Sequence, residues 1–532
     1  MSGAMQDWEL RVSGLLDHAA REHGDREIVT RWADGTETRT DWRGIRHDAL
    51  RMVQALRRIE VYPEQRVATL AMNHAKHLTA WFGATGAGCV LHTINPRLFD
   101  EQLIYIINDA RDRVLIYDAA FQPIVDRLKP LCPTVEHYIC FDSGEHCQSF
   151  EDWIGGEDGN ATWTPGEEQQ PCMLCYTSGT TGHPKGVLYS HRSNLLHTLT
   201  MIAPACLAIE PRSCVFPIVP MFHANNWGLP WACAATGAKM VYSQVNEPEA
   251  ICGLMEREKV SHAAGVPTVW FSIFQYLDET GKSLPPIRHA LSGGSAVPRT
   301  VVERFMAEGV RLAQAWGMTE TSPIATVTYE TAGWDELSLA EQVDRKSLQG
   351  RAVYGSEVRI VSLDDGVTEL PRDGTTSGAL QVRGPWTIKR YFNAEEDCVG
   401  EGQWFGTGDV AVILPDGTVK LTDRTKDVIK SGGEWISSVE LENAAVAHPD
   451  VMEAAAIGVA HPKWDERPLL VVVPRPGSGV SEEAIREFLR SRVASWWVPD
   501  AVEFVSSIPH TGTGKISKKD LRDQFRDYRL PT

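Results

Sequence analysis

The sequence lacks long hydrophobic runs, since no stretch reaches the roughly eighteen apolar residues that a membrane-spanning helix requires. Its N-terminus also lacks the uncharged apolar segment of a signal peptide, because Asp7, Glu9, Arg11 and Asp17 stand where that segment would lie. We therefore expect a cytoplasmic protein without a membrane span.

A basic surface is also missing, because the formal net charge at pH 7 is −18. Phosphates of nucleic acids and anionic lipids repel a protein of this charge, so we expect neither as a partner. Small anions such as ATP or CoA are not excluded, since local lysines and backbone dipoles decide whether a single site binds phosphate.

Neither a disulfide framework nor a caged metal is indicated. The eleven cysteines are scattered without regular spacing, which is typical of reduced thiols. Cys172 and Cys175 have C-x-x-C spacing, but they lie in an apolar run without a second cysteine pair, which disfavours a zinc or redox site. The seventeen histidines form no H-E-x-x-H cluster, so no transition-metal site is expected.

The chain is long, and its segments differ in pattern. Its 532 residues exceed what one hydrophobic core covers, so we expect two to four domains or subdomains. From residue 172 to about residue 330, short apolar runs alternate with helical patterns, which indicates α/β layers with parallel strands. Residues 355–425 are richer in strand and turn signals and predict a β-rich subdomain.

The pattern changes again after Arg424. A capping box at Ser437–Glu440 predicts the start of a helix, and strands at Ala454–Val459 and Leu469–Val473 precede a helix at Glu482–Val493. We therefore predict an α/β protein with a large multi-subdomain N-terminal domain at residues 1–424. A small α+β C-terminal domain would follow at residues 425–532.

The loop Tyr176–Val187 is the most informative segment, because it joins threonines, a serine, glycines and a lysine directly after an apolar run. Glycines let backbone N–H groups approach a polyphosphate, hydroxyls donate hydrogen bonds and lysine supplies charge. The glycines do not fit the Walker A spacing, and an ordinary polar surface loop is the competing interpretation. The expected phosphate contacts are Thr177, Ser178, Gly179, Thr180, Thr181, Gly182 and Lys185.

A second segment, Gln314–Thr321, ends in a hydroxyl–carboxylate pair. It is either a strand end capped by a threonine or part of a nucleotide site. In the second interpretation Trp316 packs on the base, Thr319 contacts a phosphate and Glu320 binds Mg²⁺, a hard cation that prefers oxygen ligands. The segment alone does not decide between them.

Four further strings are ambiguous when each is taken alone. Thr407–Asp409 is typical of a turn, and Asp423–Ser437 of an exposed basic turn before a helix. A lone lysine such as Lys515 is usually solvated, and a histidine and tryptophan like those of Pro220–Trp227 usually belong to a core.

Together and in this order, the strings resemble the motifs of the adenylate-forming superfamily. That superfamily contains acyl- and aryl-CoA synthetases, luciferases and peptide-synthetase adenylation domains. The resemblance covers the chain from about residue 10 to its C-terminus. Two departures occur, since Ala315 replaces the usual glycine and Trp316 the usual tyrosine, but a flat ring for adenine is retained.

The resemblance implies a role for each motif. Asp409 and Arg424 would bind the ribose, Lys426 would be the hinge of the small domain, and Lys515 would neutralise charge at the carboxylate and α-phosphate. Glu320 and His223 join Lys515 as implied catalytic residues, and Thr177 and Glu320 would bind Mg²⁺. Implied acid contacts are His223, Trp227 and Gly294, and further nucleotide or CoA contacts are Gly294, Ser295, Gln314, Ala315, Trp316, Gly317, Met318, Thr319, Lys430 and Trp435.

The reaction implied is the joining of a carboxylic acid, ATP and CoA through an acyl-adenylate, with release of AMP and pyrophosphate. The strings Val266–Trp270, Ser431–Ser438 and His461–Pro468 resemble the fatty acyl-CoA synthetase branch. This branch includes ligases for 3-methylmercaptopropionate in dimethylsulfoniopropionate catabolism, so that acid is the implied substrate, and a homodimer the implied assembly. A general short- or medium-chain ligase, a luciferase-like oxidase and a non-catalytic nucleotide-binding protein are the alternatives.

Overall fold

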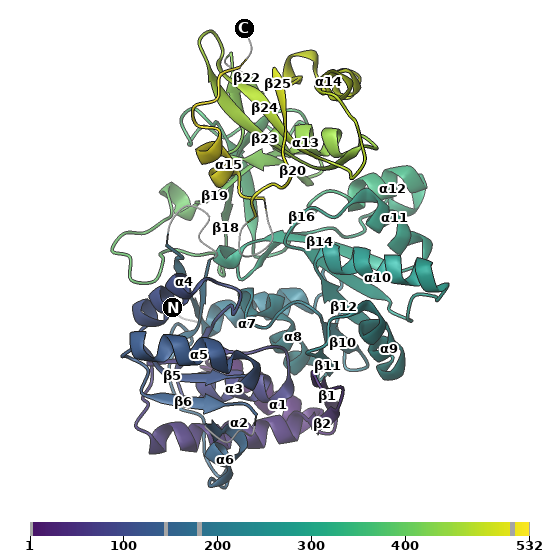
Figure 1. Cartoon of the computed structure of the whole chain (residues 1–532). Helices are drawn as coiled ribbons and strands as arrows, with labels where there is room; N and C mark the ends of the chain where they lie inside the picture. The colour runs from purple at the N-terminus through teal and green to yellow at the C-terminus, as the bar shows by residue number, and fades with distance from the viewer. Residues whose placement is uncertain (1–3, 143–146, 178–182, 433, 511–515, 531–532) are drawn as a thin grey trace. The chain divides into compact units, whose positions relative to one another are not determined.

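The computed structural model describes residues 4–142, 147–177, 183–432, 434–510 and 516–530. The chain divides into two compact units, which we describe separately (Figure 1). The first unit comprises Met1–Thr177, Pro184–Glu357 and Arg383–Phe405, and the second comprises Ser178–His183, Val358–Val382 and Gly406–Thr532. The domain boundary expected after residue 424 stays a prediction.

The first unit contains two large sheets. The smaller has the order β7-β6-β5-β3-β4-β8-β9, in which β3 pairs in parallel with β4 and β5 while β8 and β9 are antiparallel. Its strands are β3 (Arg66–Leu70), β4 (Val90–Thr93), β5 (Asp112–Tyr117), β6 (His137–Cys140), β7 (Gln148–Ser149), β8 (Pro171–Tyr176) and β9 (Gly186–Ser190).

The larger sheet has the order β16-β15-β14-β13-β12-β10-β11-β1-β2. Its central strands, from β14 to β1, are parallel to one another. The strands are β1 (Glu27–Arg31), β2 (Glu37–Asp41), β10 (Cys214–Pro217), β11 (Lys239–Ser243), β12 (His262–Gly265), β13 (His289–Gly293), β14 (Arg311–Gly317), β15 (Ile324–Val327) and β16 (Arg351–Ala352).

Helices pack on both sheets, and side-chain caps begin several of them. Asp41 accepts a hydrogen bond from Gly44 N at the start of α2, and Ser190 accepts one from Ser193 N at the start of α7. The helices of this unit are α1 (Val12–Glu22), α2 (Trp42–Arg58), α3 (Ala75–Gly86), α4 (Asp100–Ala110), α5 (Gln122–Leu128), α6 (Phe150–Gly155), α7 (His191–Met201), α8 (Leu229–Thr236), α9 (Pro248–Glu258), α10 (Pro267–Thr280), α11 (Arg299–Ala307) and α12 (Leu339–Lys346).

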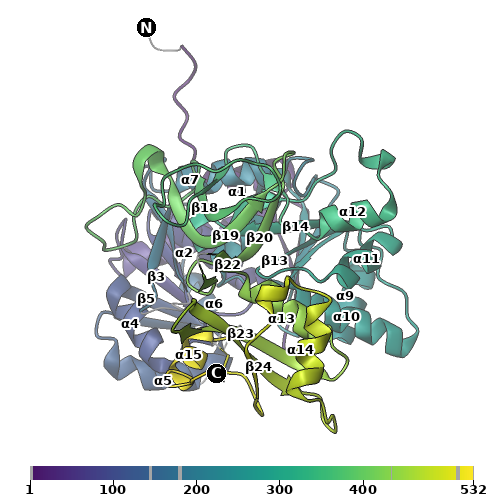
Figure 2. The same ribbon diagram turned by 90° about the horizontal axis from the view of Figure 1, so that it is seen from above.

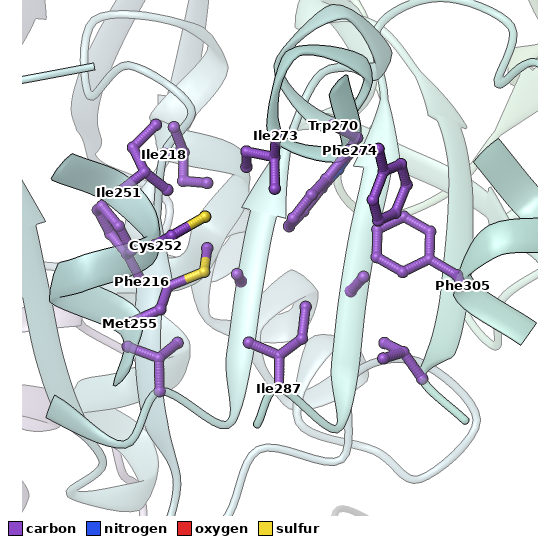
Figure 3. Close-up of a cluster of buried hydrophobic side chains, with 14 of the residues drawn as sticks. Phe216, Ile218, Ile251, Cys252, Met255, Trp270, Ile273, Phe274, Ile287 and Phe305 are labelled. Carbon is purple, nitrogen blue, oxygen red and sulfur yellow. The ribbon is translucent and has the colours of Figure 1, made fainter. Parts of the chain in front are cut away.

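The core of the larger sheet is apolar and rich in aromatic side chains. Figure 3 shows Trp270 and Phe274 of α10 against Phe305 of α11, with the ring centroids of both residues 5.0 Å from that of Phe305. Such edge-to-face pairs add to the free energy gained by burying each ring. Side chains of α9 pack against Phe216 of strand β10 in the same core. This packing holds the parallel strands whose carboxyl ends carry the predicted site residues.

The second unit is richer in β-structure. Its four-stranded sheet has the order β17-β18-β19-β20, and its five-stranded sheet the order β22-β21-β24-β23 with β25 parallel to β24. The strands are β17 (Glu357–Val361), β18 (Ser377–Arg383), β19 (Phe405–Ile413), β20 (Val419–Arg424), β21 (Ile429–Ser431), β22 (Glu434–Ile436), β23 (Val451–His461), β24 (Asp465–Pro474) and β25 (Ala501–Phe504). Its helices are α13 (Ser438–Val446), α14 (Glu482–Arg490) and α15 (Lys518–Gln524).

Helices α13 and α14 lie beside β23 and β24 in both views of the ribbon (Figures 1 and 2). Leu441 and Ala445 of α13 and Ile485 and Leu489 of α14 are buried against the strands, as their helical spacing requires. Ser437 caps α13 through Glu440 N, as the capping box predicts. The last predicted helix ends earlier than expected, at Arg490 instead of Val493.

The expectation of a mixed α/β fold is confirmed, including the parallel strands after residue 172 and the β-rich segment after residue 355. Among the described residues, no helix is both long enough and apolar enough to cross a membrane.

Candidate active site

The two ends of the predicted phosphate loop are held together by backbone geometry. Strands β8 and β9 are antiparallel, and beyond their last pair Thr177 N donates to Lys185 O at 2.9 Å. Lys185 N donates in return to Thr177 Oγ1 at 3.2 Å. The predicted contacts Ser178, Gly179, Thr180, Thr181 and Gly182 lie outside the described residues. The described ends therefore place Thr177 and Lys185 at the base of one loop.

Glu320 lies in a 3₁₀ turn, Thr319–Thr321, that directly follows β14. Its carboxylate is buried and accepts a hydrogen bond at Oε1 from the hydroxyl of Tyr391 at 2.8 Å. Its backbone oxygen accepts a second hydrogen bond from Ile388 N at 2.8 Å. Burial raises the pKa of Tyr391, and the neighbouring Glu320 carboxylate raises it further, so the phenol is a neutral donor at pH 7.

Tyr391 also connects Glu320 to the phosphate loop. The ammonium of Lys185 lies 4.9 Å from the centroid of the Tyr391 ring, within the range of a cation–π contact. The structure thus brings Lys185 and Glu320 together on one tyrosine, while Thr177 is hydrogen-bonded to Lys185 at the base of the loop. The sequence interpretation missed Tyr391, which lies 71 residues after Glu320 in a segment without regular secondary structure. No local pattern distinguishes it from a surface tyrosine.

The neighbouring residue Thr319 is held by a buried tyrosine. Tyr189 of β9 donates its hydroxyl to Thr319 O at 2.7 Å. Burial raises the pKa of Tyr189 well above its ordinary value, so the group donates a neutral hydrogen bond. Strand β9 therefore positions the turn that carries Thr319 and Glu320.

Strand β14 carries Gln314, Ala315, Trp316 and Gly317. A methyl group on Gly317 would lie 1.6 Å from Pro323 O, so this close approach of two backbone segments requires glycine. Trp316 is largely buried, and Met318 follows the strand. Gln314 Oε1 is buried without a hydrogen-bond partner among the described residues, which leaves it able to accept a bond from a ligand.

His223 and Trp227 flank an unusual stretch of backbone. Ala224–Gly228, which we call the left-handed turn, has positive φ at every residue. His223 precedes it with its side chain exposed, and Trp227 is buried within it. A methyl group on Gly294, whose φ is +82°, would lie 3.8 Å from Trp227 Cζ2. Two of the three predicted acid contacts, Trp227 and Gly294, are therefore neighbours, and exposed Ser295 follows Gly294.

In the second unit, Asp409 and Arg424 are cross-strand partners on β19 and β20. Arg424 Nε lies 2.9 Å from Asp409 Oδ1, with the carboxylate buried and the guanidinium half-exposed. This pairing orients the carboxylate and leaves much of the arginine accessible. The two predicted ribose contacts thus form one ion pair.

The predicted hinge residue, Lys426, follows β20 directly. Thr425 N donates to Gly408 O at 2.8 Å, and Asp427 N donates to Arg424 O at 2.9 Å, so the backbone on both sides is hydrogen-bonded. Arg522 also pairs with Asp427 at 2.8 Å. Burial lowers the pKa of Lys426, an effect opposed by nearby Asp427.

Lys430 and Trp435 are partners across the hairpin of β21 and β22. The ammonium of Lys430 lies 5.5 Å from the centroid of the Trp435 ring. Lys515 and Gly433 lie outside the described residues. Within the described residues, no group of three or more His, Cys, Asp or Glu side chains is placed to hold a metal ion.

The chain matches two models of known protein families. The model of the AMP-binding enzyme family matches residues 16–392, and that of the AMP-binding enzyme C-terminal domain matches residues 440–515. A 3-methylmercaptopropionyl-CoA ligase of Ruegeria lacuscaerulensis is 44% identical over 99% of both chains. A medium-chain-fatty-acid–CoA ligase of Ectopseudomonas oleovorans is 42% identical over 100% of this chain and 98% of its own.

A solved structure shows the same fold. The crystal structure of an anthranilate CoA ligase in complex with anthranoyl-AMP superimposes with a TM-score of 0.84, over 98% of this chain and 99% of that one. The two sequences are 24% identical, so this likeness concerns the fold alone.

Proposed function

The chain belongs to the family of AMP-binding enzymes and is an AMP-forming acyl-CoA synthetase that uses ATP and CoA, and from this premise we propose that its acid is 3-methylmercaptopropionate. The proposal rests on buried Trp227, whose ring lies beside Gly294 and would shorten the acid pocket there. The relative with 44% identity is named for the same acid.

A medium-chain fatty acid is the second candidate. The relative named for medium-chain fatty acids is 42% identical, nearly as similar as the first. Both acids are aliphatic carboxylates, so they differ mainly in the length of the pocket that each requires. One methylene in an apolar pocket discriminates only about 10- to 200-fold, so the two activities can coexist.

We propose that Thr177 and Glu320 bind Mg²⁺ beside the phosphates of ATP. Oxygen donors suit this hard cation, and a carboxylate has about four lone-pair positions, of which the Tyr391 hydroxyl occupies one at Oε1. Mg²⁺ bound there supplies positive charge that lowers the repulsion between ATP and an attacking carboxylate. Lys185 and the loop residues Ser178, Gly179, Thr180, Thr181 and Gly182 are the proposed phosphate contacts.

Trp316 is the proposed stacking partner of adenine, and Gln314 Oε1 would accept a hydrogen bond from its amino group. The buried Oε1 atom without a described partner supports this assignment, since buried polar atoms are nearly always hydrogen-bonded. Ala315, Gly317, Met318, Thr319, Gly294 and Ser295 are the proposed neighbours of the nucleotide. Asp409 would accept hydrogen bonds from the ribose hydroxyls while Arg424 holds its carboxylate in place.

The two half-reactions need different groups. In the first, Lys515 would stabilise charge on the acid and the α-phosphoryl group while the carboxylate displaces pyrophosphate. In the second, rotation about Lys426 would withdraw Lys515 and present Lys430 and Trp435 to the CoA thiol, which displaces AMP. His223, at the entrance to the left-handed turn, would gate the acid pocket between the two steps.

The test is a substrate panel. Propionate, butyrate, octanoate and 3-methylmercaptopropionate are each incubated with ATP and Mg²⁺, with and without CoA, while AMP, pyrophosphate, acyl-CoA and O₂ are measured. We expect acyl-CoA and AMP in equal amounts, no O₂ uptake, and the highest kcat/KM for the methylthio acid. A highest value for octanoate would support the medium-chain candidate. Oxygen uptake would contradict the ligase reaction.

The role of Lys515 is tested by the substitution Lys515→Ala. We expect a loss of acid-dependent pyrophosphate exchange of about 10²-fold or more, because one preorganised charge at the transferred group is removed. Undiminished exchange would rule out that role. Lys519→Ala is the matched control, since Lys519 is an exposed lysine of α15.

A cytoplasmic location and a homodimer complete the proposal. Cysteine usage supports the first, because all eleven thiols are free in the structure, as expected in a reducing compartment. Light scattering after size-exclusion chromatography tests the second, for which a mass near twice 59.0 kDa is expected.

A further inference from the structure

A buried asparagine connects the two sheets of the first unit. Asn73 lies just after β3 of the seven-stranded sheet and is 5% exposed. Its Nδ2 donates to Pro217 O at 3.0 Å and to Val219 O at 2.8 Å. Its Oδ1 accepts from Met221 N at 2.7 Å. The three bonds therefore hold one segment, which leaves β10 of the other sheet.

Asparagine alone suits this position among side chains of its size. It offers two donors and an acceptor on one rigid amide, whereas aspartate offers no donor and leucine offers neither. All three bonds go to backbone groups, so the amide fixes the path of the chain from Pro217 to Met221. Leaving these buried groups without partners would destabilise that path.

The segment leads directly into the left-handed turn. The φ values there are +41° at Ala224, +58° at Asn225, +48° at Asn226, +56° at Trp227 and +78° at Gly228. A left-handed conformation costs a residue other than glycine about 1–2 kcal/mol, although asparagine tolerates it better than alanine or tryptophan. Such a run persists only where surrounding contacts impose it.

Those contacts form a network of neutral amides. Asn226 Nδ2 donates to Val219 O at 2.5 Å, the same oxygen that accepts from Asn73. Asn225 Nδ2 donates to Asn194 Oδ1 at 3.2 Å, and Asn194 Nδ2 donates to Cys172 Sγ of β8 at 3.2 Å. The turn is therefore tied to the segment after β10 through Val219 O, the oxygen it shares with Asn73, and to β8 of the seven-stranded sheet through Asn194.

We propose that Asn73 is a positioning residue that sets acid selectivity, because it fixes the left-handed turn and with it Trp227 and His223. The inference rests on the proposed function, which places these two side chains at the acid. Asn73 itself does not touch the substrate. Its loss lets the turn relax, so that Trp227 no longer closes one end of the pocket.

The variant Asn73→Asp keeps the size of the side chain and removes both donors. The carboxylate oxygen that replaces Nδ2 would face the carbonyl oxygens of Pro217 and Val219, which is repulsive, while the other could still accept from Met221 N. We expect the KM for the acid to rise about tenfold, with the KM for ATP changed less than about twofold, since only the acid pocket is misplaced. We also expect the ratio of kcat/KM between 3-methylmercaptopropionate and octanoate to move toward one.

Asn108→Asp is the matched control. Asn108 Nδ2 donates to one backbone oxygen, that of Leu131, at 3.0 Å at the end of α4. The same chemical change there should leave both KM values and the selectivity ratio unaltered. Asn73→Ser keeps one donor and provides a milder variant if Asn73→Asp does not fold, with an expected rise in acid KM that is smaller but in the same direction.

Hydrogen exchange followed by mass spectrometry reports on the turn without requiring activity. In Asn73→Asp, amides of residues 217–228 should exchange faster, while those of the distant helix α12 should not. Faster exchange with an inactive wild type would contradict the proposed function and leave the positioning role intact. An even rise across the first unit, or a lower Tm with unchanged acid KM and selectivity, would overturn the role of Asn73.

Discussion

Two buried polar networks of this protein are built in opposite ways. Around the left-handed turn, the first unit uses neutral groups: Asn73, Asn194, Asn225, Asn226 and the imidazole of His197, which lies against Gly228. Next to the predicted hinge, the second unit uses charges. We call this second group the lysine cluster, and it consists of Asp423, Ser438, Glu442 and Lys518.

The lysine cluster joins a strand to two helices. Lys518 Nζ lies 2.7 Å from Glu442 Oε1 and donates to Ser438 Oγ at 2.6 Å. Ser438 Oγ donates in turn to Asp423 Oδ1 at 2.9 Å. Burial raises the pKa of Asp423 and of Glu442, and Lys518 opposes both shifts. Each buried carboxylate therefore depends on the single lysine.

The two networks respond to different perturbations. Neutral amides do not titrate in the physiological pH range and carry no net charge for salt to screen, which suits a turn proposed to fix the acid pocket. Buried charges are costly to remove from water and are stable only while each has its partner. The lysine cluster should therefore be sensitive to the loss of one member, and the left-handed turn to the loss of neutrality.

The largest effect is expected from breaking the lysine cluster. Lys518→Met should reduce the stability of the second unit by about 3–5 kcal/mol, because two buried carboxylates lose their cation. Exchange protection of α13 and β23 is the measurement. Lys420→Met is the control, since Lys420 pairs with Glu440 at 3.0 Å but its side chain is 46% exposed. Its loss should lower the free energy of unfolding by less than about 1 kcal/mol. Equal losses in both variants would contradict the distinction between the networks.

The stability of the first unit should fall at low pH because of His197. Burial lowers the pKa of His197 to about 3, and its Nε2 accepts from Ile324 N at 3.3 Å, so the ring is neutral in the folded protein. The pKa of His197 is lower in the folded protein than in the unfolded chain. Its contribution to the free energy of unfolding is therefore fully present above about pH 6.5 and is lost as pH falls toward about 3. At pH 5 we expect a loss of about 2 kcal/mol in the first unit.

The lysine cluster should show the opposite sign. The raised pKa values of Asp423 and Glu442 mean that their contribution to stability is largest at low pH and is lost as pH rises through the folded values. Across a pH series, exchange protection corrected for intrinsic rates should therefore shift in opposite directions, falling toward low pH at α7 and toward high pH at α13. His197→Gln should remove the shift at α7, and an unchanged shift in that variant would exclude His197 as its cause.

Tyr391 is a neutral donor that makes a hydrogen bond to a charged acceptor, the Glu320 carboxylate. Tyr391→Phe removes the hydrogen bond to Glu320, and bonds to charged groups contribute about 1.5–3 kcal/mol. We expect kcat/KM for ATP to fall about tenfold or more. Tyr189→Phe is the matched control, because its hydroxyl donates to the neutral oxygen of Thr319 and should matter less. A larger loss in the control would contradict the assignment.

The smallest effect is expected at the half-exposed pair of Arg424 and Asp409. Arg424→Lys keeps the charge and should change the free energy of unfolding by less than about 1 kcal/mol, with a difference that shrinks between about 0.1 M and about 1 M salt. A several-fold rise in the KM for ATP would accompany it if the proposed ribose site is correct. Thermal unfolding and ATP kinetics measure the two effects separately.

Much of the fold follows from local pattern. The apolar runs between residue 172 and about residue 330 predict the parallel strands of that region, where β10 to β13 lie, because buried parallel strands are continuously apolar. The cap at Ser437 was also predictable, since capping depends on neighbours three residues apart. Helix α14 ends three residues before the predicted end, as helix termini depend on packing beyond the local sequence.

The candidate site was predictable only where short motifs carry the chemistry. Thr177, Lys185, Glu320, Asp409 and Arg424 could be named from their strings, but the strings do not tell which of them touch. The contact of Lys185 with Tyr391, and the pairing of Asp409 with Arg424 across two strands, depend on sheet register and chain path. The roles of these residues stay predictions until the variants are measured.

The class of fold, the family and the residues proposed for phosphate, ribose and acid could be inferred from the sequence, because they depend on local spacing and composition. The path of the chain in three dimensions places Tyr391 between Lys185 and Glu320, and it brings Asn73, which follows β3, to the segment that follows β10 of the other sheet. The physical reason is that hydrogen bonds of this kind join groups 71 to 148 residues apart. Periodicity within a segment contains no information about such distant partners.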